Sequence, residues 1–222
     1  MATSTVEDYL KQIFLEQDRG ATRVATGRLA TALGVAPGTA TAMMKTLTES
    51  GLVDYEPYSG VQLTDAGSKL ATRVLRRHRL IELFLVQVLG MDWSEVHAEA
   101  EVLEHAVSEG LIERIDQMLG HPTVDPHGDP IPTSAGLVER PDHPSLLTCP
   151  LSQHLEITRV IDQRSEFLQL LERHGLMPGR RAEVTARDPL AETVQIRPDG
   201  GEVLQLGFLA ASRILARPVA TG

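Results

Sequence analysis

The sequence contains only one cysteine, Cys149, and no long uninterrupted apolar run. A single cysteine excludes an internal disulfide framework and is typical of a reducing compartment. The apolar stretch at 80–89 is interrupted by Glu82 and Gln87 and is shorter than the ~20 residues of a membrane-spanning helix. The first residues also lack the basic and apolar segments of a secretory signal. We therefore expect a cytoplasmic protein that does not enter a membrane, and we interpret the Cys149 thiol as incidental to function.

Negative charge is in excess, but it is unevenly distributed along the chain. The 222 residues carry a net charge of −9, and their 42% hydrophobic and 23% charged content is that of an ordinary globular protein. Up to residue 80 there are 10 Lys and Arg against 8 Asp and Glu, whereas the rest of the chain carries 11 against 22. An acidic protein is usually a poor partner for phosphate backbones, so only the first 80 residues remain candidates for binding nucleic acid.

The first 90 residues have the pattern of a winged helix. Apolar residues at helical spacing predict a helix over 6–17. Two short helices over 26–34 and 37–50, joined by a turn that contains glycine and proline, predict a helix-turn-helix. Two β-prone runs within 52–64 predict a hairpin, which would be the wing. A long helix is expected over 64–90.

The rest of the chain predicts further helices, an irregular connector and a small β-barrel. Helices are expected at about 94–108 and 111–119. Residues 120–150 hold seven prolines and three glycines and are interpreted as an irregular connector. Beyond them we expect one helix over 167–174, and five short β-type runs favour a barrel. These runs are residues 154–161, 181–185, 193–196, 203–206 and 214–217.

A run of acidic and histidine residues on the expected 94–108 helix points to metal chemistry. At about 100° per residue, four residues of metal-ligand type would share a face about 100° wide. They are His97, Glu101, Glu104 and His105. Carboxylates and imidazoles on one face disfavour each other unless a cation lies among them, and a divalent metal would satisfy this need. The alternative interpretation is a solvated acidic helix face.

Three other residues are candidates to complete such a site. His78 and Glu82 lie four residues apart on the preceding helix, so they share a face and offer a nitrogen and an oxygen ligand. The alternative is a surface pair beside neighbouring arginines. Asp8 lies near the start of the first helix, where a carboxylate also favours the helix dipole without any metal.

Eight segments carry a family resemblance. They are residues 7–14, 53–67, 77–85, 97–105, 122–132, 156–161, 167–171 and 176–179. In this order and spacing they resemble the diphtheria-toxin-repressor family of metal-dependent transcriptional repressors, which includes iron and manganese regulators. The resemblance implies a mainly α N-terminal part, formed by a winged helix-turn-helix and a helical dimerisation domain, and a C-terminal SH3-like β-barrel. The implied domains are the winged-helix DNA-binding domain 1–73, the metal-binding and dimerisation domain with its following loop 74–140, the Pro-rich linker 141–150 and the SH3-like domain 151–222.

The resemblance also implies two metal sites per chain. The first would lie between the first helix and the Glu-x-x-Glu-His run, with the ligands Asp8, Glu101, Glu104 and His105. The second would have the ligands His78, Glu82 and His97, with Gln163 and Glu166 added from the SH3-like domain.

Departures from the family patterns indicate which metal is bound. Iron-responsive relatives place Met and Cys where this chain has Asp8 and Glu101. Oxygen and imidazole ligands without sulfur suit Mn²⁺, so we expect Mn²⁺ as the effector, with Fe²⁺ as the alternative. The short manganese regulators carry a carboxylate where this chain has Lys11, which argues against their closely spaced pair of metals here.

DNA reading is expected from the helix over 37–50, whose first turn would face the major groove of double-stranded operator DNA. Its small residues suit close approach, thymine-methyl contacts and backbone bonds to phosphate. They are Ala36, Pro37, Gly38, Thr39, Thr41 and Ala42. Phosphates would be neutralised by Arg23, Arg28 and Lys45, and the wing would contribute Tyr58 and Ser59. The alternative for each arginine is a solvated surface charge.

Together these features predict a metal-dependent repressor that binds its operator as a homodimer and controls metal-uptake genes. Bound metal would tie the DNA-binding domain to the dimerisation helix, and repulsion among the acids would loosen that link without metal. The alternatives are a metal-independent winged-helix regulator and a hydrolytic metalloenzyme. The sequence has no His-Glu-x-x-His run, glycine-rich phosphate loop or nucleophile elbow, so we do not expect an enzyme.

Overall fold

The computed structural model describes residues 3–139 and 141–219, which divide into two compact units. The first unit takes the described residues up to 78 together with 103–107 and 132–138. The second takes 79–102, 108–131 and the described residues from 139 onward. No helix in the described ranges is both long and apolar enough to cross a membrane.

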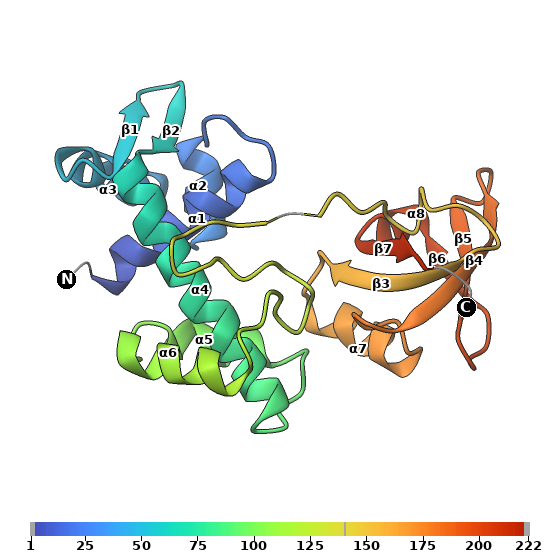
Figure 1. Cartoon of the computed structure of the whole chain (residues 1–222). Coiled ribbons are helices and arrows are strands. Elements are labelled where there is room, and N and C mark those ends of the chain that lie inside the picture. The colour runs from blue at the N-terminus through green and yellow to red at the C-terminus, as the bar shows by residue number, and fades with distance from the viewer. Residues whose placement is uncertain (1–2, 140, 220–222) are drawn as a thin grey trace. The chain divides into compact units, whose positions relative to one another are not determined.

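The first unit contains the expected winged helix (Figure 1). Its elements are α1 (Ser4–Asp18), α2 (Thr26–Ala32), α3 (Pro37–Glu49), β1 (Val53–Glu56), β2 (Gly60–Leu63) and the first half of α4 (Asp65–Gln87). Strands β1 and β2 pair antiparallel, and a bridge between Val24 and Val61 ties the chain before α2 to the wing. The predicted helices and hairpin are therefore confirmed close to their expected limits.

Helical periodicity explains the core of this unit. On α1 the buried residues Tyr9, Leu10 and Ile13 lie on one face, and α3 contributes Ala40 and Met44 from successive turns. Helix α3 begins with a proline at its first position, where the missing N–H would have no partner. Because these apolar residues point inward, the small and polar residues of α3 face away from the core.

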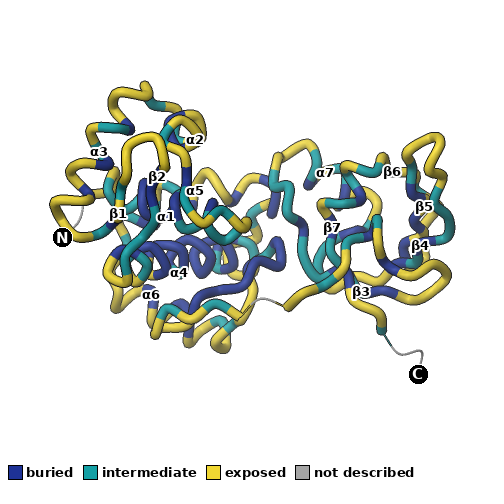
Figure 2. Tube along the Cα trace, turned by 90° about the horizontal axis from the view of Figure 1, so that it is seen from above, coloured by how far each residue is buried: buried dark blue, intermediate teal, exposed yellow. Residues whose placement is uncertain are grey.

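Helix α4 contributes to both units. Its 23 residues are buried over most of their length, as the dark blue stretch in Figure 2 shows. It is followed by α5 (Val96–Leu103) and α6 (Glu109–Met118). Helix α5 is shorter than the expected 94–108, because after Leu103 the chain leaves the helix in a turn in which the N–H groups of Ala106 and Val107 bond to the Leu103 carbonyl.

The C-terminal part of the second unit is a five-stranded antiparallel sheet with two helices. Its elements are β3 (His154–Val160), α7 (Ser165–Arg173), β4 (Arg181–Asp188), β5 (Thr193–Pro198), β6 (Leu204–Gly207), α8 (Phe208–Ala211) and β7 (Ile214–Pro218). The strand order is β6-β5-β4-β3-β7. Alternating residues such as Leu155 and Ile157 on β3 and Val194 and Ile196 on β5 fill the core, which also holds Cys149. All five predicted strands are confirmed.

The proline-rich connector is irregular, as expected, but much of it is buried. The described residues of 120–150 form no named helix or strand, yet Asp125 and 127–132 are buried. The Val160 N–H donates to the His127 carbonyl, so the connector lies directly against β3. Gly128 has a left-handed backbone, with φ of 84°, and a Cβ there would lie 2.0 Å from the Thr158 carbonyl oxygen. This contact requires glycine.

Replacing Gly128 with alanine tests that contact. Gly120 also has a left-handed backbone, but a Cβ added there would meet open space. Gly120→Ala is therefore a matched control for backbone strain alone. We expect Gly128→Ala to lose about 1–3 kcal/mol more stability than Gly120→Ala, because the connector must move off β3. Chemical denaturation of the metal-free variants measures this difference, and equal losses would contradict the close packing.

Candidate functional site

A group of metal-ligand residues lies between α1 and the turn after α5, within the first unit. Asp8, Glu104 and His105 each offer a ligand atom, and these atoms lie within 4.8 Å of one another. His105 Nε2 is 2.8 Å from Asp8 Oδ1 and 3.5 Å from Glu104 Oε1. Two carboxylates and an imidazole nitrogen form a donor set that fits a divalent cation such as Mn²⁺. Three of the four residues predicted for the first metal are therefore brought together.

The geometry behind that prediction was wrong in one respect. Glu104 and His105 do not continue the helical face of His97 and Glu101, because α5 ends at Leu103. They lie in the turn that follows, where Glu104 points inward and is fully buried. The turn therefore separates Glu104 and His105 from the helical residues His97 and Glu101. Among the described residues, Glu101 does not cluster with Asp8.

His105 is held in a defined orientation by a residue that the sequence analysis missed. Its Nδ1 lies 2.8 Å from Glu7 Oε2, and the other Glu7 oxygen accepts a 3.0 Å bond from Arg77. The His105 Nε2 lies within hydrogen-bond distance of Asp8 Oδ1. With Nδ1–H donating to Glu7, a bound metal could take the place of the proton between Nε2 and Asp8. The only sequence signal was the position of Glu7 immediately before Asp8.

Besides His105, two nitrogens lie close to the Glu104 carboxylate. Lys11 Nζ lies 2.7 Å from its Oε1, and His78 Nδ1 lies 2.5 Å from its Oε2. His78 was predicted as a ligand of the second metal, but within the first unit it contacts a predicted ligand of the first. Burial raises the pKa of the Asp8 carboxyl, and the neighbouring His105 opposes that rise.

A second group of ligand atoms lies within the second unit. Glu82 on α4 and the connector residues Asp125 and His127 are all buried and offer ligand atoms within 4.8 Å of one another. The His127 Nε2 lies 2.8 Å from the Trp93 carbonyl, to which it can only donate, and the two rings stack with centroids 5.5 Å apart. In the neutral ring His127 Nδ1 would carry a lone pair, and this nitrogen has no hydrogen-bond partner among the described residues.

The charges of this second group also fit a cation. Glu82 Oε2 lies 4.0 Å from His127 Nδ1, too far for a hydrogen bond. Burial raises the pKa of Asp125 well above its usual value, and the neighbouring Asp129 and Glu82 add to that rise, while Arg79, 3.6 Å from Asp125 Oδ2, opposes it. A buried imidazole lone pair between buried carboxylates is the environment that a divalent metal stabilises. Asp125 and His127 were missed because the connector has no periodicity to indicate their direction.

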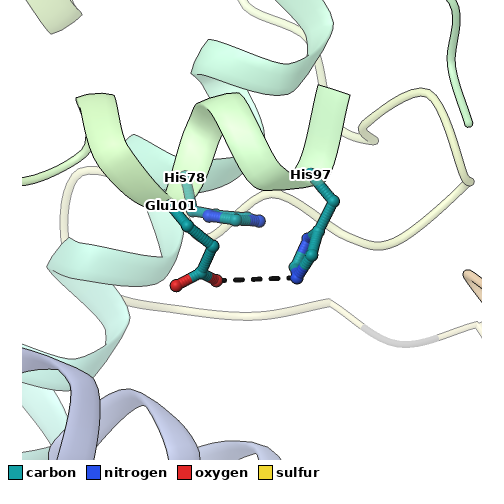
Figure 3. Close-up of side chains that lie close together, drawn as sticks. All are labelled: His78, His97 and Glu101. Carbon is teal, nitrogen blue, oxygen red and sulfur yellow. Dashed lines mark ion pairs between the residues drawn. The ribbon is translucent and has the colours of Figure 1, made fainter. Parts of the chain in front are cut away.

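Of the other residues predicted for the second metal, His97 contacts Glu82, whereas Gln163 and Glu166 lie elsewhere in the second unit. His97 Nδ1 is 3.1 Å from Glu82 Oε1, and its Nε2 is 3.6 Å from Glu101 on the same helix, the ion pair drawn in Figure 3. Gln163 donates a 2.7 Å bond to Asp129, and Glu166 is exposed in the first turn of α7. Their roles as ligands stay predictions.

The residues predicted to read DNA are mostly exposed. On and before α3 these are Ala36, Pro37, Gly38, Thr39, Ala42 and Lys45, with Thr41 half-buried. At the wing, Tyr58 and Ser59 are exposed in the β1–β2 turn. Arg23 pairs with Asp54 at 2.5 Å and Arg28 pairs with Glu16, so both arginines have acidic partners within the first unit.

Models of three known domain families match most of the chain. Residues 1–61 match the iron dependent repressor, N-terminal DNA binding domain. Residues 64–133 match the iron dependent repressor, metal binding and dimerisation domain. Residues 145–218 match the FeoA domain, which corresponds to the C-terminal sheet.

Individual relatives agree with this assignment. The HTH-type transcriptional regulator MntR of Bacillus subtilis is 36% identical over 120 residues, which are 54% of this chain and 82% of MntR. The iron-dependent repressor IdeR of Mycobacterium tuberculosis is 38% identical over 135 residues, 61% of this chain and 57% of IdeR. A solved structure of a manganese-dependent transcriptional repressor in complex with manganese aligns with a TM-score of 0.87 and 40% identity, covering 96% of this chain and all of that one. On this basis the chain belongs to the diphtheria-toxin-repressor family of metal-dependent transcriptional repressors, whose members are regulators and not enzymes.

Proposed function

We propose that this protein is a Mn²⁺-dependent repressor that binds operator DNA as a dimer and controls genes for metal-ion uptake. The observation that carries the proposal is the cluster of Asp8, Glu104 and His105, whose donors are oxygen and nitrogen without sulfur. Mn²⁺ prefers hard oxygen donors, whereas soft sulfur ligands favour other transition metals. Fe²⁺ is the second candidate, because carboxylate and imidazole ligands also accept it and IdeR is an iron-dependent repressor.

In the first metal site, Asp8 would be the ligand from the winged helix, and Glu104 and His105 the ligands from the turn after α5. Glu101 is retained as a further ligand on the basis of the family resemblance. When bound, the ion supplies the positive charge that allows two carboxylates to approach one imidazole. Glu7 would act on His105 as a positioning residue, because it would accept a hydrogen bond from Nδ1–H and so direct Nε2 towards Asp8 and the metal.

DNA recognition would fall to the exposed first turn of α3. The small side chains there allow the backbone to approach the groove, while Lys45 offers a positive charge to phosphate. In a dimer the two recognition helices must lie about 34–36 Å apart, one turn of DNA. Fixing Asp8 against the turn after α5 would bias the winged helix towards that spacing, and this is how metal binding would favour DNA binding.

For the second metal we propose Glu82, Asp125 and His127 as ligands. The support is their burial, their mutual distances and the unbonded lone pair of His127 Nδ1. The alternative set predicted from the sequence shares Glu82 but uses His97, which contacts the other oxygen of Glu82 and is half exposed. The two sets can therefore be separated by their histidines.

Metal-stimulated DNA binding is the first test of the proposed function. We expect metal-stripped protein to bind its own upstream DNA weakly and to gain at least about tenfold in affinity with Mn²⁺, at lower metal concentration than with Fe²⁺ under anaerobic conditions. Asp8→Ala should abolish the gain, because the winged helix loses its ligand. Fluorescence anisotropy of labelled DNA measures both.

Glu172→Ala is the matched control, since it removes an exposed carboxylate from α7 in the other unit. It should respond to Mn²⁺ as the wild type does. Full DNA affinity of the metal-stripped wild type would contradict metal dependence, and activation at lower Fe²⁺ than Mn²⁺ would identify an iron regulator.

The second site is tested by counting metal ions. We expect the wild type to bind about two Mn²⁺ ions per chain, whereas His127→Ala binds about one and His97→Ala still binds about two. Inductively coupled plasma mass spectrometry after equilibrium dialysis gives the ratio. Loss of one ion in His97→Ala with two retained in His127→Ala would instead support the set predicted from the sequence.

A further inference from the structure

Lys11 is a buried lysine at the first metal site that no ligand assignment includes. Its Nζ lies 2.7 Å from Glu104 Oε1, and its side chain is 8% exposed beside a carboxylate that is fully buried. Buried lysines are rare, and burying an ion pair is costly unless both charges are paired. Either charge left unpaired in this buried position would destabilise the folded protein, which favours the Lys11–Glu104 ion pair.

The oxygen that Lys11 contacts is the one that faces the ligand cluster. Glu104 Oε1 is also 3.5 Å from His105 Nε2, while Oε2 is directed to His78. A metal bound by Asp8 and His105 would take Oε1 as its Glu104 ligand. The ammonium group and the metal would thus act on the same oxygen, one as a hydrogen-bond donor and the other as a Lewis acid.

Lys11 changes the net charge of the first metal site. Glu7, Asp8 and Glu104 carry three negative charges, and Arg77 and Lys11 carry two positive ones within the same contacts. Without metal, Glu7 and Glu104 are therefore paired and Asp8 lies against His105, so much of the repulsion expected from the sequence is neutralised. With a divalent ion added, the set becomes net positive, whereas without Lys11 it would become neutral.

We propose that Lys11 is an internal counter-ion that competes with the metal for Glu104 and thereby sets how much metal the repressor requires. The inference rests on the proposed first metal site. In the metal-free protein Lys11 keeps Glu104 neutralised and in place, so the site persists in its folded arrangement. In the metal-bound protein the same charge weakens binding, which raises the metal concentration at which the repressor responds.

Neutral and charged replacements of Lys11 separate this role from packing. Lys11→Gln keeps a hydrogen-bond donor and removes the charge, Lys11→Met removes both, and Lys11→Arg keeps the charge. We expect Lys11→Gln and Lys11→Met to bind Mn²⁺ at least about tenfold more tightly than the wild type, which corresponds to about 1.4 kcal/mol. Both should unfold at lower temperature than the wild type when metal-free, because the buried Glu104 carboxylate loses its ammonium partner and keeps only the two histidines. Lys11→Arg should bind within about threefold of the wild type.

The measurement is competition of the full-length protein with a fluorescent chelator for Mn²⁺, with thermal unfolding of each metal-free protein by circular dichroism. Lys69→Met is the matched control, since it removes an exposed lysine charge from α4 in the same unit. It should leave both readouts within about threefold and a few degrees of the wild type.

The outcomes distinguish this inference from the proposed function. If the wild type and Glu104→Gln bind Mn²⁺ equally weakly, the metal site itself is wrong. If the wild type binds through Glu104 but Lys11→Gln and Lys11→Met bind no more tightly, only the counter-ion role is overturned. Should Lys11→Met fail to fold without metal, Lys11→Gln alone decides.

Discussion

Burial of the Glu104 carboxylate is the constraint on which the arrangement of the first unit depends. A fully buried carboxylate must be paired, and its partners come from separate parts of the chain: Lys11 from α1, His78 from α4 and His105 from its own turn. The pairing of this buried carboxylate thus brings the ligand atoms of the proposed metal site together before any metal binds. Within the first unit the winged helix is joined to the turn after α5 through charges, and a metal bound at the proposed site would act on contacts that are already formed.

In both candidate sites a histidine is oriented by a hydrogen bond from one of its ring nitrogens to a protein acceptor. His105 has its Nδ1 on the Glu7 carboxylate, and His127 has its Nε2 on the Trp93 carbonyl. In each ring one nitrogen is committed to a protein acceptor, and the other nitrogen faces carboxylates. The sites differ in burial: Asp8 is partly exposed in the first, whereas Glu82, Asp125 and His127 are all buried in the second. A metal would therefore enter the first site with less movement of the protein.

Periodicity explains why the elements could be predicted and why part of the site could not. The helices of the winged helix and the five strands have apolar residues at regular spacing, and all of them were located. The end of α5 was missed because Glu104 and His105 continue a helical pattern in the sequence, and only the turn after Leu103 reveals that they leave it. Asp125 and His127 lie in an irregular segment whose side-chain directions depend on contacts with β3 and Trp93. Such long-range contacts have no local signature.

Helix α4 begins after the wing and ends beyond the boundary between the units, without an interruption at residues 78 and 79. A helix propagates cooperatively, because each turn supplies the hydrogen-bond partners of the next. Fraying of α4 at residues 78 and 79 would therefore remove hydrogen-bond partners from the turns on both sides. Excising the winged helix as a separate fragment would cut this helix in mid-course. The winged helix therefore has no end within α4, and any fragment boundary there must be placed inside a continuous helix.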